Sequence, residues 1–357
     1  MNPPIEIPTA WDDVTPELMT AVISPTYPDA VVGRVTVVLR DDGTNRRARL
    51  GLEYATGRGP ASVFVKAESD VPGRREIHAR NGNLFNESLL FRSGVDLPLE
   101  HPAVYTAIID EDALDYLIVM EDLVARGADP RDPTRPFTAD EVARGLRGLA
   151  ALHSRWWDRV ASEPALAWVQ LFAPTDGWLR PMRKIVPLGI DRAGAAIPES
   201  VRQLGVDGLV DVWTRSVESL ATGPQTLLHG DPHIGNTYLL PDGTVGFLDW
   251  QVVRSGSWSH DVAYFLQGAL TEDDRRAHEA DLVEQYRAAL DVPRDALPGS
   301  DEAWLRYRAS SAHGLTVWLM TLPSDVHAPE RSLALVCRYA AAFDELDTPA
   351  AVGQLSD

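Results

Sequence analysis

The chain of 357 residues carries 52 acidic and 33 basic residues, which gives a formal net charge of −19. Such a charge repels nucleic acid and anionic membrane surfaces, so neither is expected as a partner, whereas a cationic small molecule is compatible with it. A single cysteine excludes an intramolecular disulfide and a thiolate metal cluster. The cysteine content, the lack of a basic and apolar leader after Met1, and the lack of an apolar run near ~20 residues favour a cytoplasmic protein.

The first third of the chain is expected to be rich in strands. Residues 1–30 form a lead-in, in which Thr15 caps a short helix that begins at Pro16. Apolar-rich and alternating segments between short turns then indicate an antiparallel meander. Its strands are Val35–Leu39, Arg47–Tyr54 and Ser62–Lys66. A helix at Asn83–Arg92 and a strand at Tyr116–Met120 follow.

The remainder is expected to be mainly helical. The sequence Thr138-Ala139-Asp140-Glu141 is a capping box that begins a long amphipathic helix. A short strand, Gln225–Leu228, and a hairpin of Thr237–Leu240 with Val245–Leu248 interrupt the helices, which resume at Asp261.

This order of elements predicts an α+β protein with two lobes. After the lead-in, residues 31–123 form a sheet-rich N-lobe with a helix, and residues 124–357 form a larger helical C-lobe. The connector between them is expected near Glu121–Arg126.

The strongest chemical signal is the segment His229-Gly230-Asp231-Pro232-His233-Ile234-Gly235-Asn236, followed by the hairpin and by Phe247-Leu248-Asp249-Trp250. Phosphoryl transfer from ATP requires a carboxylate aimed at the acceptor hydroxyl and oxygen ligands for the Mg²⁺ that bridges the phosphates. Asp231 can serve the hydroxyl. Asn236 and Asp249 can bind the metal, because the hairpin between them brings the two close together.

This segment resembles the catalytic and metal loops of the aminoglycoside phosphotransferase and choline kinase superfamily. Residues 257–266 are similar to the helix start that follows the metal loop there, and Asp261 matches a carboxylate that braces the catalytic loop through its backbone. The resemblance extends over residues 30–345, with 227–266 as its specific part. It implies a bilobal, protein-kinase-like fold with a small antiparallel-sheet N-lobe and a mainly helical C-lobe, and it implies ATP and Mg²⁺ as cofactors.

The resemblance also implies nucleotide-binding residues. Lys66 matches a lysine that contacts the α- and β-phosphates, and Glu87 matches the helix glutamate that pairs with it and fixes its position. Glu76 is the competing partner. Glu87 is preferred because it lies within an apolar-periodic helix.

The segment Met120-Glu121-Asp122-Leu123 resembles the hinge, where backbone groups of Glu121 and Leu123 would hold adenine. Two positions depart from the protein-kinase pattern. The turn after the first strand has one glycine, Gly43, and no triple-glycine phosphate loop. His233 replaces a lysine and would touch the transferring phosphate as a catalytic residue, whereas His229 is expected to brace the loop from inside.

The acceptor is expected to be a small molecule: aminoglycoside-like, an amino alcohol or a sugar. Only eleven residues separate Asp249 from Asp261, too few for the long segment on which a protein kinase lays out a peptide. The acidic surplus slightly favours a cationic acceptor.

Two other functions compete with this interpretation. One is a non-catalytic nucleotide-binding protein of the same fold, which the presence of Asp231, Asn236 and Asp249 together disfavours. The other is a non-haem iron enzyme that uses His229-x-Asp231 with a distant histidine, which the helical pattern after residue 137 disfavours.

Overall fold

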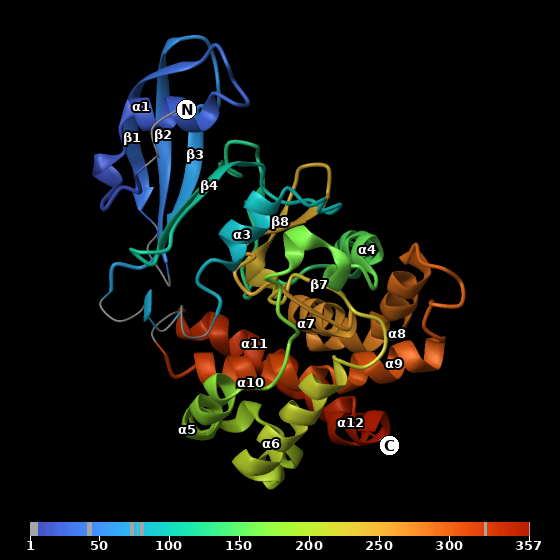
Figure 1. Ribbon diagram of the computed structural model, residues 1–357. Coiled ribbons are helices and arrows are strands. Elements are labelled where there is room, and N and C mark those ends of the chain that lie inside the picture. Colours follow the sequence, from blue (N-terminus) through green and yellow to red (C-terminus); the bar gives the residue numbers. More distant parts are fainter. Residues whose placement is uncertain are drawn as a thin grey trace. The chain divides into compact units, whose positions relative to one another are not determined.

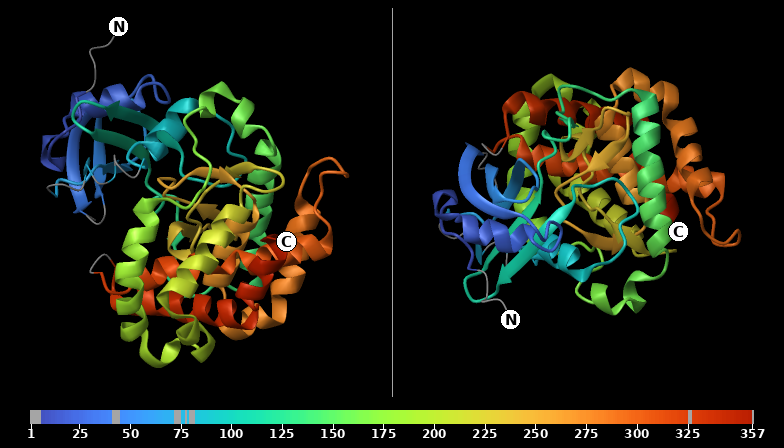
Figure 2. Two further views of the ribbon diagram at one scale, coloured as in Figure 1. Left: turned by 60° about the horizontal axis from the view of Figure 1, so that its bottom comes forward. Right: turned by 90° about the horizontal axis from the view of Figure 1, so that it is seen from above.

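The computed structural model describes residues 6–40, 45–71, 75–76, 78, 82–324 and 327–356 (Figures 1 and 2). It divides into two compact units. Unit 1 comprises Met1–Val95, His101–Asp129 and Asp249–Val252, and unit 2 comprises Asp96–Glu100, Pro130–Leu248 and Val253–Asp357. Across the described ranges, no helix is both long enough and apolar enough to cross a membrane.

Unit 1 is built on a five-stranded sheet in the order β1-β2-β3-β5-β4, and each neighbouring pair runs antiparallel (Figure 1). Its strands are β1 (Val31–Arg40), β2 (Arg46–Thr56), β3 (Ser62–Ala67), β4 (Val104–Asp110) and β5 (Asp115–Glu121). Its helices include the 3₁₀ turn η1 (Trp11–Asp13), α1 (Pro16–Ile23) and α3 (Asn86–Ser93). The predicted meander is confirmed, whereas β4 was not predicted because all but its last residue are half-buried, without alternation.

The alternation read in the sequence of β2 decides which face of the sheet is buried. Ala48, Leu50 and Leu52 are buried on one face, while the residues between them are half-buried. Helix α1 packs against this core through Met19 and Ile23. The glycine-poor turn that contains Gly43 lies outside the described residues.

Unit 2 is mainly helical. Its helices are α4 (Ala139–Trp156), α5 (Asp176–Ala193), α6 (Glu199–Ser219), α7 (Ser259–Ala269), α8 (Glu272–Ala289), α9 (Ser300–Ala309), α10 (Ser311–Thr321), α11 (Pro329–Glu345) and α12 (Thr348–Ser356). Its 3₁₀ turns within the described residues are η2 (Val160–Ser162), η3 (Pro164–Leu166), η4 (Gly194–Ala196) and η5 (Ile234–Asn236). The predicted capping box starts α4: Glu141 N–H donates to the Thr138 hydroxyl, and Thr138 N–H donates to the Glu141 carboxylate.

Short strands flank the loops of unit 2. Strand β7 (Thr226–Leu228) pairs with β10 (Arg254–Gly256), and β8 (Thr237–Leu239) pairs with β9 (Val245–Phe247) as the predicted hairpin. The two-residue strand β6 (Asp129–Pro130) completes a sheet in the order β6-β8-β9.

Helix α7 lies at the centre of unit 2, and every one of its residues is buried. It contacts α4, α8, α9, α10 and α11. The Tyr339 ring of α11 packs closely against Gly268 of α7 and Gly314 of α10. This packing requires glycine, because a Cβ atom at either position would overlap the Tyr339 side chain. The polar side chains of α7 are therefore held inside a close-packed core.

Candidate active site

The segment His229–His233 connects β7 to η5 and is held by a buried carboxylate. Asp261 of α7 accepts hydrogen bonds from the backbone N–H groups of His229 (2.7 Å) and Gly230 (3.0 Å). Gly230 has a backbone φ of +85°, a conformation that residues other than glycine rarely adopt. The bracing contact that the sequence resemblance implied for Asp261 is therefore present.

Two histidines fix the same loop. His229 accepts the N–H of Asp231 at Nδ1 (3.3 Å) and donates Nε2–H to the carbonyl of Leu248 (3.1 Å). His260 donates Nε2–H to the carbonyl of Gly230 (3.0 Å). Both ring nitrogens of His229 are engaged, so this side chain is an internal brace and offers no lone pair to an iron ion.

His153 is a bracing residue that sequence reasoning missed. It is fully buried on the apolar face of α4, where Nε2 lies 3.3 Å from Asp261 and Nδ1 lies 2.7 Å from the Tyr286 hydroxyl. A histidine within the apolar stripe of the predicted helix was the available signal. Burial alone would raise the pKa of Asp261, but the hydrogen bond from His153 and the neighbouring imidazoles lower it overall.

Asp231 lies at the end of the braced loop, with 26% of its side chain exposed. The Asn236 amide donates to both the backbone carbonyl (2.9 Å) and the carboxylate (3.1 Å) of Asp231. His233 accepts the Gly235 N–H at Nδ1 (3.1 Å), which leaves the proton on Nε2, 3.9 Å from the Asp231 carboxylate. The amide nitrogen of Asn236 is thus committed to Asp231, and its carbonyl oxygen is the atom that suits a cation.

Lys66, Glu87 and Asp249 form a second cluster, within unit 1. The Lys66 ammonium lies 2.6 Å from Glu87 and 2.9 Å from Asp249, and the exposed fractions of these side chains are 4%, 5% and 20%. Burial alone would lower the pKa of Lys66, but the carboxylates of Asp249 and Glu87 raise it, so the ammonium stays charged. The pairing with Glu87 is as predicted, whereas Glu76 is exposed.

Asp249 has a backbone conformation that is costly for a residue with a side chain. Its φ of +67° lies in the left-handed region. The cluster supports this geometry, since the N–H of Trp250 donates to the Glu87 carboxylate (3.2 Å). Backbone strain of this kind is concentrated at functional sites, where the surrounding contacts hold it in place.

The predicted hinge residues lie at the end of β5. Glu121 exchanges backbone and side-chain hydrogen bonds with Ala103, and its carboxylate pairs with Arg126 (3.3 Å). The Leu123 carbonyl accepts the N–H groups of Arg126 and Ala128, which form a tight turn. The roles of Glu121 and Leu123 toward adenine stay predictions.

The predicted site residues therefore fall into two groups. Asp231, His233 and Asn236 lie together in unit 2, and Lys66, Glu87 and Asp249 lie together in unit 1. Leu248, the residue before Asp249, donates its N–H to the Asn236 carbonyl (2.9 Å). The metal site shared by Asn236 and Asp249 stays a prediction. The described residues contain no group of three or more His, Cys, Asp or Glu side chains that could bind a metal by itself.

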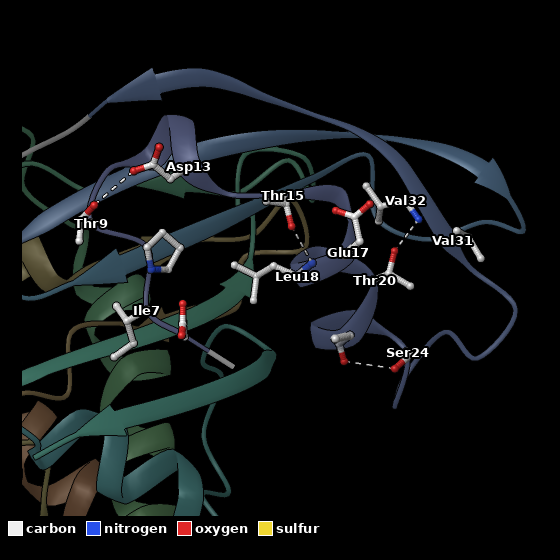
Figure 3. Close-up of a pocket in the computed structure, with 13 residues that line it drawn as sticks. Ile7, Thr9, Asp13, Thr15, Glu17, Leu18, Thr20, Ser24, Val31 and Val32 are labelled. Carbon is white, nitrogen blue, oxygen red and sulfur yellow. Dashed lines mark hydrogen bonds between the residues drawn. The ribbon is translucent and has the colours of Figure 1, made fainter. Parts of the chain in front are cut away.

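A pocket of unit 1 lies elsewhere, beside α1 and the start of β1 (Figure 3). Three of its polar side chains form hydrogen bonds within the chain: Thr9 with Asp13, Thr15 with Leu18, and Thr20 with Val32. It contains none of the predicted site residues, so it is not the candidate active site.

One segment of the chain is similar in sequence to a known protein family. Residues 193–297 match the model of the ecdysteroid kinase-like family, a segment that includes Asp231, Asn236, Asp249 and Asp261. No curated protein matches the chain by sequence.

Solved structures extend the likeness to nearly the whole chain. A choline kinase of Cryptosporidium parvum Iowa II has a TM-score of 0.52 at 10% identity, covering 95% of this chain and 98% of that chain. A spectinomycin phosphotransferase, solved with ADP and spectinomycin, has a TM-score of 0.51 at 12% identity, covering 94% and 99%. A candidate aminoglycoside phosphotransferase of Ralstonia eutropha JMP134 has a TM-score of 0.51 at 15% identity, covering 93% and 98%.

These likenesses identify the fold as the protein-kinase-like fold of small-molecule kinases. The predicted α+β, protein-kinase-like fold is confirmed, and the resemblance to the aminoglycoside phosphotransferase and choline kinase superfamily is confirmed at the level of the fold. At these identities the likeness establishes the architecture and leaves the reaction to be argued from the site.

Replacing Asp261 by asparagine is expected to destabilise unit 2. The N–H groups of His229 and Gly230 bind different carboxylate oxygens, and the amide would place an NH2 donor against one of these two N–H groups. The free energy of unfolding should fall by roughly 2 to 4 kcal/mol at pH 7, the scale of losing hydrogen bonds to a buried charged group. Urea denaturation measures this loss.

The pH dependence provides an internal check. A carboxylate whose pKa is lowered by folding contributes stability above about pH 3.9, and this contribution is lost as the pH falls through its folded-state pKa. The difference in the free energy of unfolding between wild type and Asp261→Asn should therefore become smaller at acidic pH. Asp207→Asn, at an exposed position paired with Arg183, is the matched control and should change little. An Asp261→Asn protein as stable as wild type at pH 7 would contradict the bracing role.

Proposed function

We propose that this protein transfers the γ-phosphate of ATP to a hydroxyl group of a small molecule. The observation that carries the proposal is the geometry around Asp231. Its carboxylate is partly exposed at the end of a loop whose backbone is fixed by Asp261, His229 and His260. Phosphoryl transfer depends mainly on positioning and charge stabilisation, and a rigidly aimed carboxylate suits that demand.

Asp231 is assigned to the acceptor hydroxyl. It orients the hydroxyl and takes its proton late in the transfer, because a loose transition state requires little pull from a base. The Nε2–H of His233 is fixed by the hydrogen bond at Nδ1, so it can donate to an oxygen that gains negative charge beside Asp231. His233 is therefore assigned to the transferring phosphate.

The residues present fit ATP with Mg²⁺. Asn236 offers an amide oxygen and Asp249 a carboxylate, and Mg²⁺ prefers such oxygen ligands. Lys66, kept charged by Glu87 and Asp249, suits the α- and β-phosphates, and the backbone near Glu121 and Leu123 suits adenine. Bound Mg²⁺ would offset charge on the phosphates. The ADP bound to the structurally similar spectinomycin phosphotransferase supports this choice of nucleotide.

Asp231→Asn tests the assignment of the acceptor-binding carboxylate. The variant keeps the shape of the side chain but cannot accept the proton. Its kcat should fall at least ~100-fold while the affinity for ATP stays within a few fold, because Asp231 acts on the acceptor and not on the nucleotide. Steady-state ADP release and nucleotide calorimetry give the two numbers. Near-normal turnover of the variant would remove Asp231 from the mechanism, and a wild type that binds ATP without turnover would indicate a non-catalytic protein.

Metal binding should depend on nucleotide. Two protein oxygens are too few for a tight Mg²⁺ site, since this ion keeps several waters and depends on phosphate oxygens. Calorimetry should detect weak Mg²⁺ binding to the protein alone and clear binding with ATP present. Asp249→Ala should abolish the nucleotide-dependent binding. Micromolar Mg²⁺ affinity without nucleotide that survives Asp249→Ala would contradict this ligand set.

The charge of the acceptor is a finer proposal. The net charge of −19 favours a cationic hydroxyl compound, because an acidic surface concentrates cations near the protein. For a cationic acceptor, kcat/KM should fall as ionic strength rises, since salt screens the attraction. Rates measured from low to high salt on the best acceptor decide the matter. A neutral acceptor with rates independent of salt would contradict the proposal.

A further inference from the structure

Asp122 is a buried carboxylate directly after β5, with no role in the arrangement described so far. It lies between Glu121 and Leu123, the two residues proposed to hold adenine, and 4% of its side chain is exposed. A charged group that is withdrawn from water is costly unless other groups of the protein compensate it. The groups around Asp122 therefore show which parts of unit 1 it connects.

The Asp122 carboxylate connects three segments of unit 1. Its Oδ2 atom accepts the hydroxyl of Ser62 in β3 (2.6 Å) and lies 2.9 Å from Nε of Arg49 in β2. Its Oδ1 atom accepts the N–H of Val124 (3.1 Å), in the turn that follows β5. One side chain thus ties the segment after β5 to two strands of the sheet.

These contacts lie on the face of the sheet that carries Lys66. Ser62 and Lys66 are four residues apart in β3, so their side chains point to the same side. Arg49 stands opposite Phe64 in the register of β2 and β3, and cross-strand partners also share a face. The residues that alternate with these in β3 are buried in the core on the opposite face. The groups that bind Asp122 and the lysine proposed for the phosphates are therefore on one surface.

Asp122 fixes the spacing between two parts of the proposed nucleotide site. Strand β3 has Lys66 near one end and the Ser62 contact with Asp122 at the other, and four residues of strand span about 13 Å. Without this contact, the backbone beside Asp122 can shift relative to Lys66. A nucleotide that must reach both parts binds well only when both are in place, so its affinity falls with the population of that arrangement.

We infer that Asp122, through Arg49 and Ser62, is a positioning residue that holds the backbone of Glu121 and Leu123 where adenine binds. This inference rests on the proposed function. Asp122 acts through the backbone of its two neighbours and does not touch the nucleotide.

The test uses Asp122→Asn, which keeps the shape of the side chain and removes the charge that attracts Arg49. Calorimetry measures the affinity for ATP and for tripolyphosphate, each with Mg²⁺, because tripolyphosphate has the phosphate chain without the base. The affinity for ATP should fall about 10-fold, as it would if the binding-competent arrangement became a tenth of the population. The affinity for tripolyphosphate should stay within about two-fold, since Lys66 is not displaced.

Steady-state kinetics give a second measurement. ADP release is followed with whichever amino alcohol, sugar or aminocyclitol gives the highest turnover. KM for ATP should rise about 10-fold in Asp122→Asn, whereas kcat at saturating ATP should stay within a few fold, because bound ATP selects the competent arrangement. A general loss of structure would lower kcat as well.

Asp115→Asn is the matched control. Asp115 is a buried carboxylate at the other end of β5, where it pairs with Arg46 of β2 (3.6 Å) and with Arg75 (3.0 Å). Its replacement should lower the free energy of unfolding, measured by urea denaturation, while the affinity for ATP stays within about two-fold. Equal losses of ATP affinity in Asp115→Asn and Asp122→Asn would indicate a general weakening of the sheet and would overturn the inference.

Arg49→Gln approaches the same ion pair from the other side. It should weaken ATP binding, and the double variant should bind ATP no more weakly than Asp122→Asn alone. If Asp122→Asn failed to fold, Arg49→Gln would decide, and an unchanged affinity for ATP would count against the inference. A wild-type KM for ATP in Asp122→Asn would remove Asp122 from the nucleotide site and leave the proposed function intact. A wild-type protein that does not bind ATP would refute the proposed function itself.

Discussion

The buried carboxylate of Asp261 is the constraint on which the candidate active site depends. An unpaired charge in a protein interior costs several kcal/mol, so Asp261 is stable there only with its partners in place. These partners are two backbone N–H groups of the His229–His233 segment and His153 of α4. One charge therefore links a central helix, a second helix and the loop that carries Asp231. The loop cannot relax without leaving a buried anion unsatisfied, and this rigidity positions Asp231.

A related principle operates in unit 1. The Lys66 ammonium is shared between Glu87 and Asp249, so one buried cation fixes a strand, a helix and the segment after the hairpin. The unfavourable backbone conformation of Asp249 is maintained by these contacts. In both units, charged groups that are costly to bury define the geometry, and apolar packing surrounds them.

Local sequence patterns predicted the elements whose formation depends on nearby residues. Alternation located β2, the capping box located the start of α4, and the spacing of Asp231, Asn236 and Asp249 located the loops. Strand β4 was missed because its burial does not alternate. His153 was missed because its role depends on side chains that folding brings together from distant positions. The nearest signal in the sequence was only a histidine within an apolar helix.

The proposed reaction forms a phosphate ester on a small hydroxyl compound. The most direct measurement incubates the purified protein with ATP, Mg²⁺ and a library of cationic and neutral hydroxyl compounds, and follows products by ³¹P NMR. A phosphate monoester resonance should grow in step with ADP for at least one compound and should be absent with Asp231→Asn. ATP that stays intact with every compound, or ADP that forms with inorganic phosphate only, would contradict the proposed reaction.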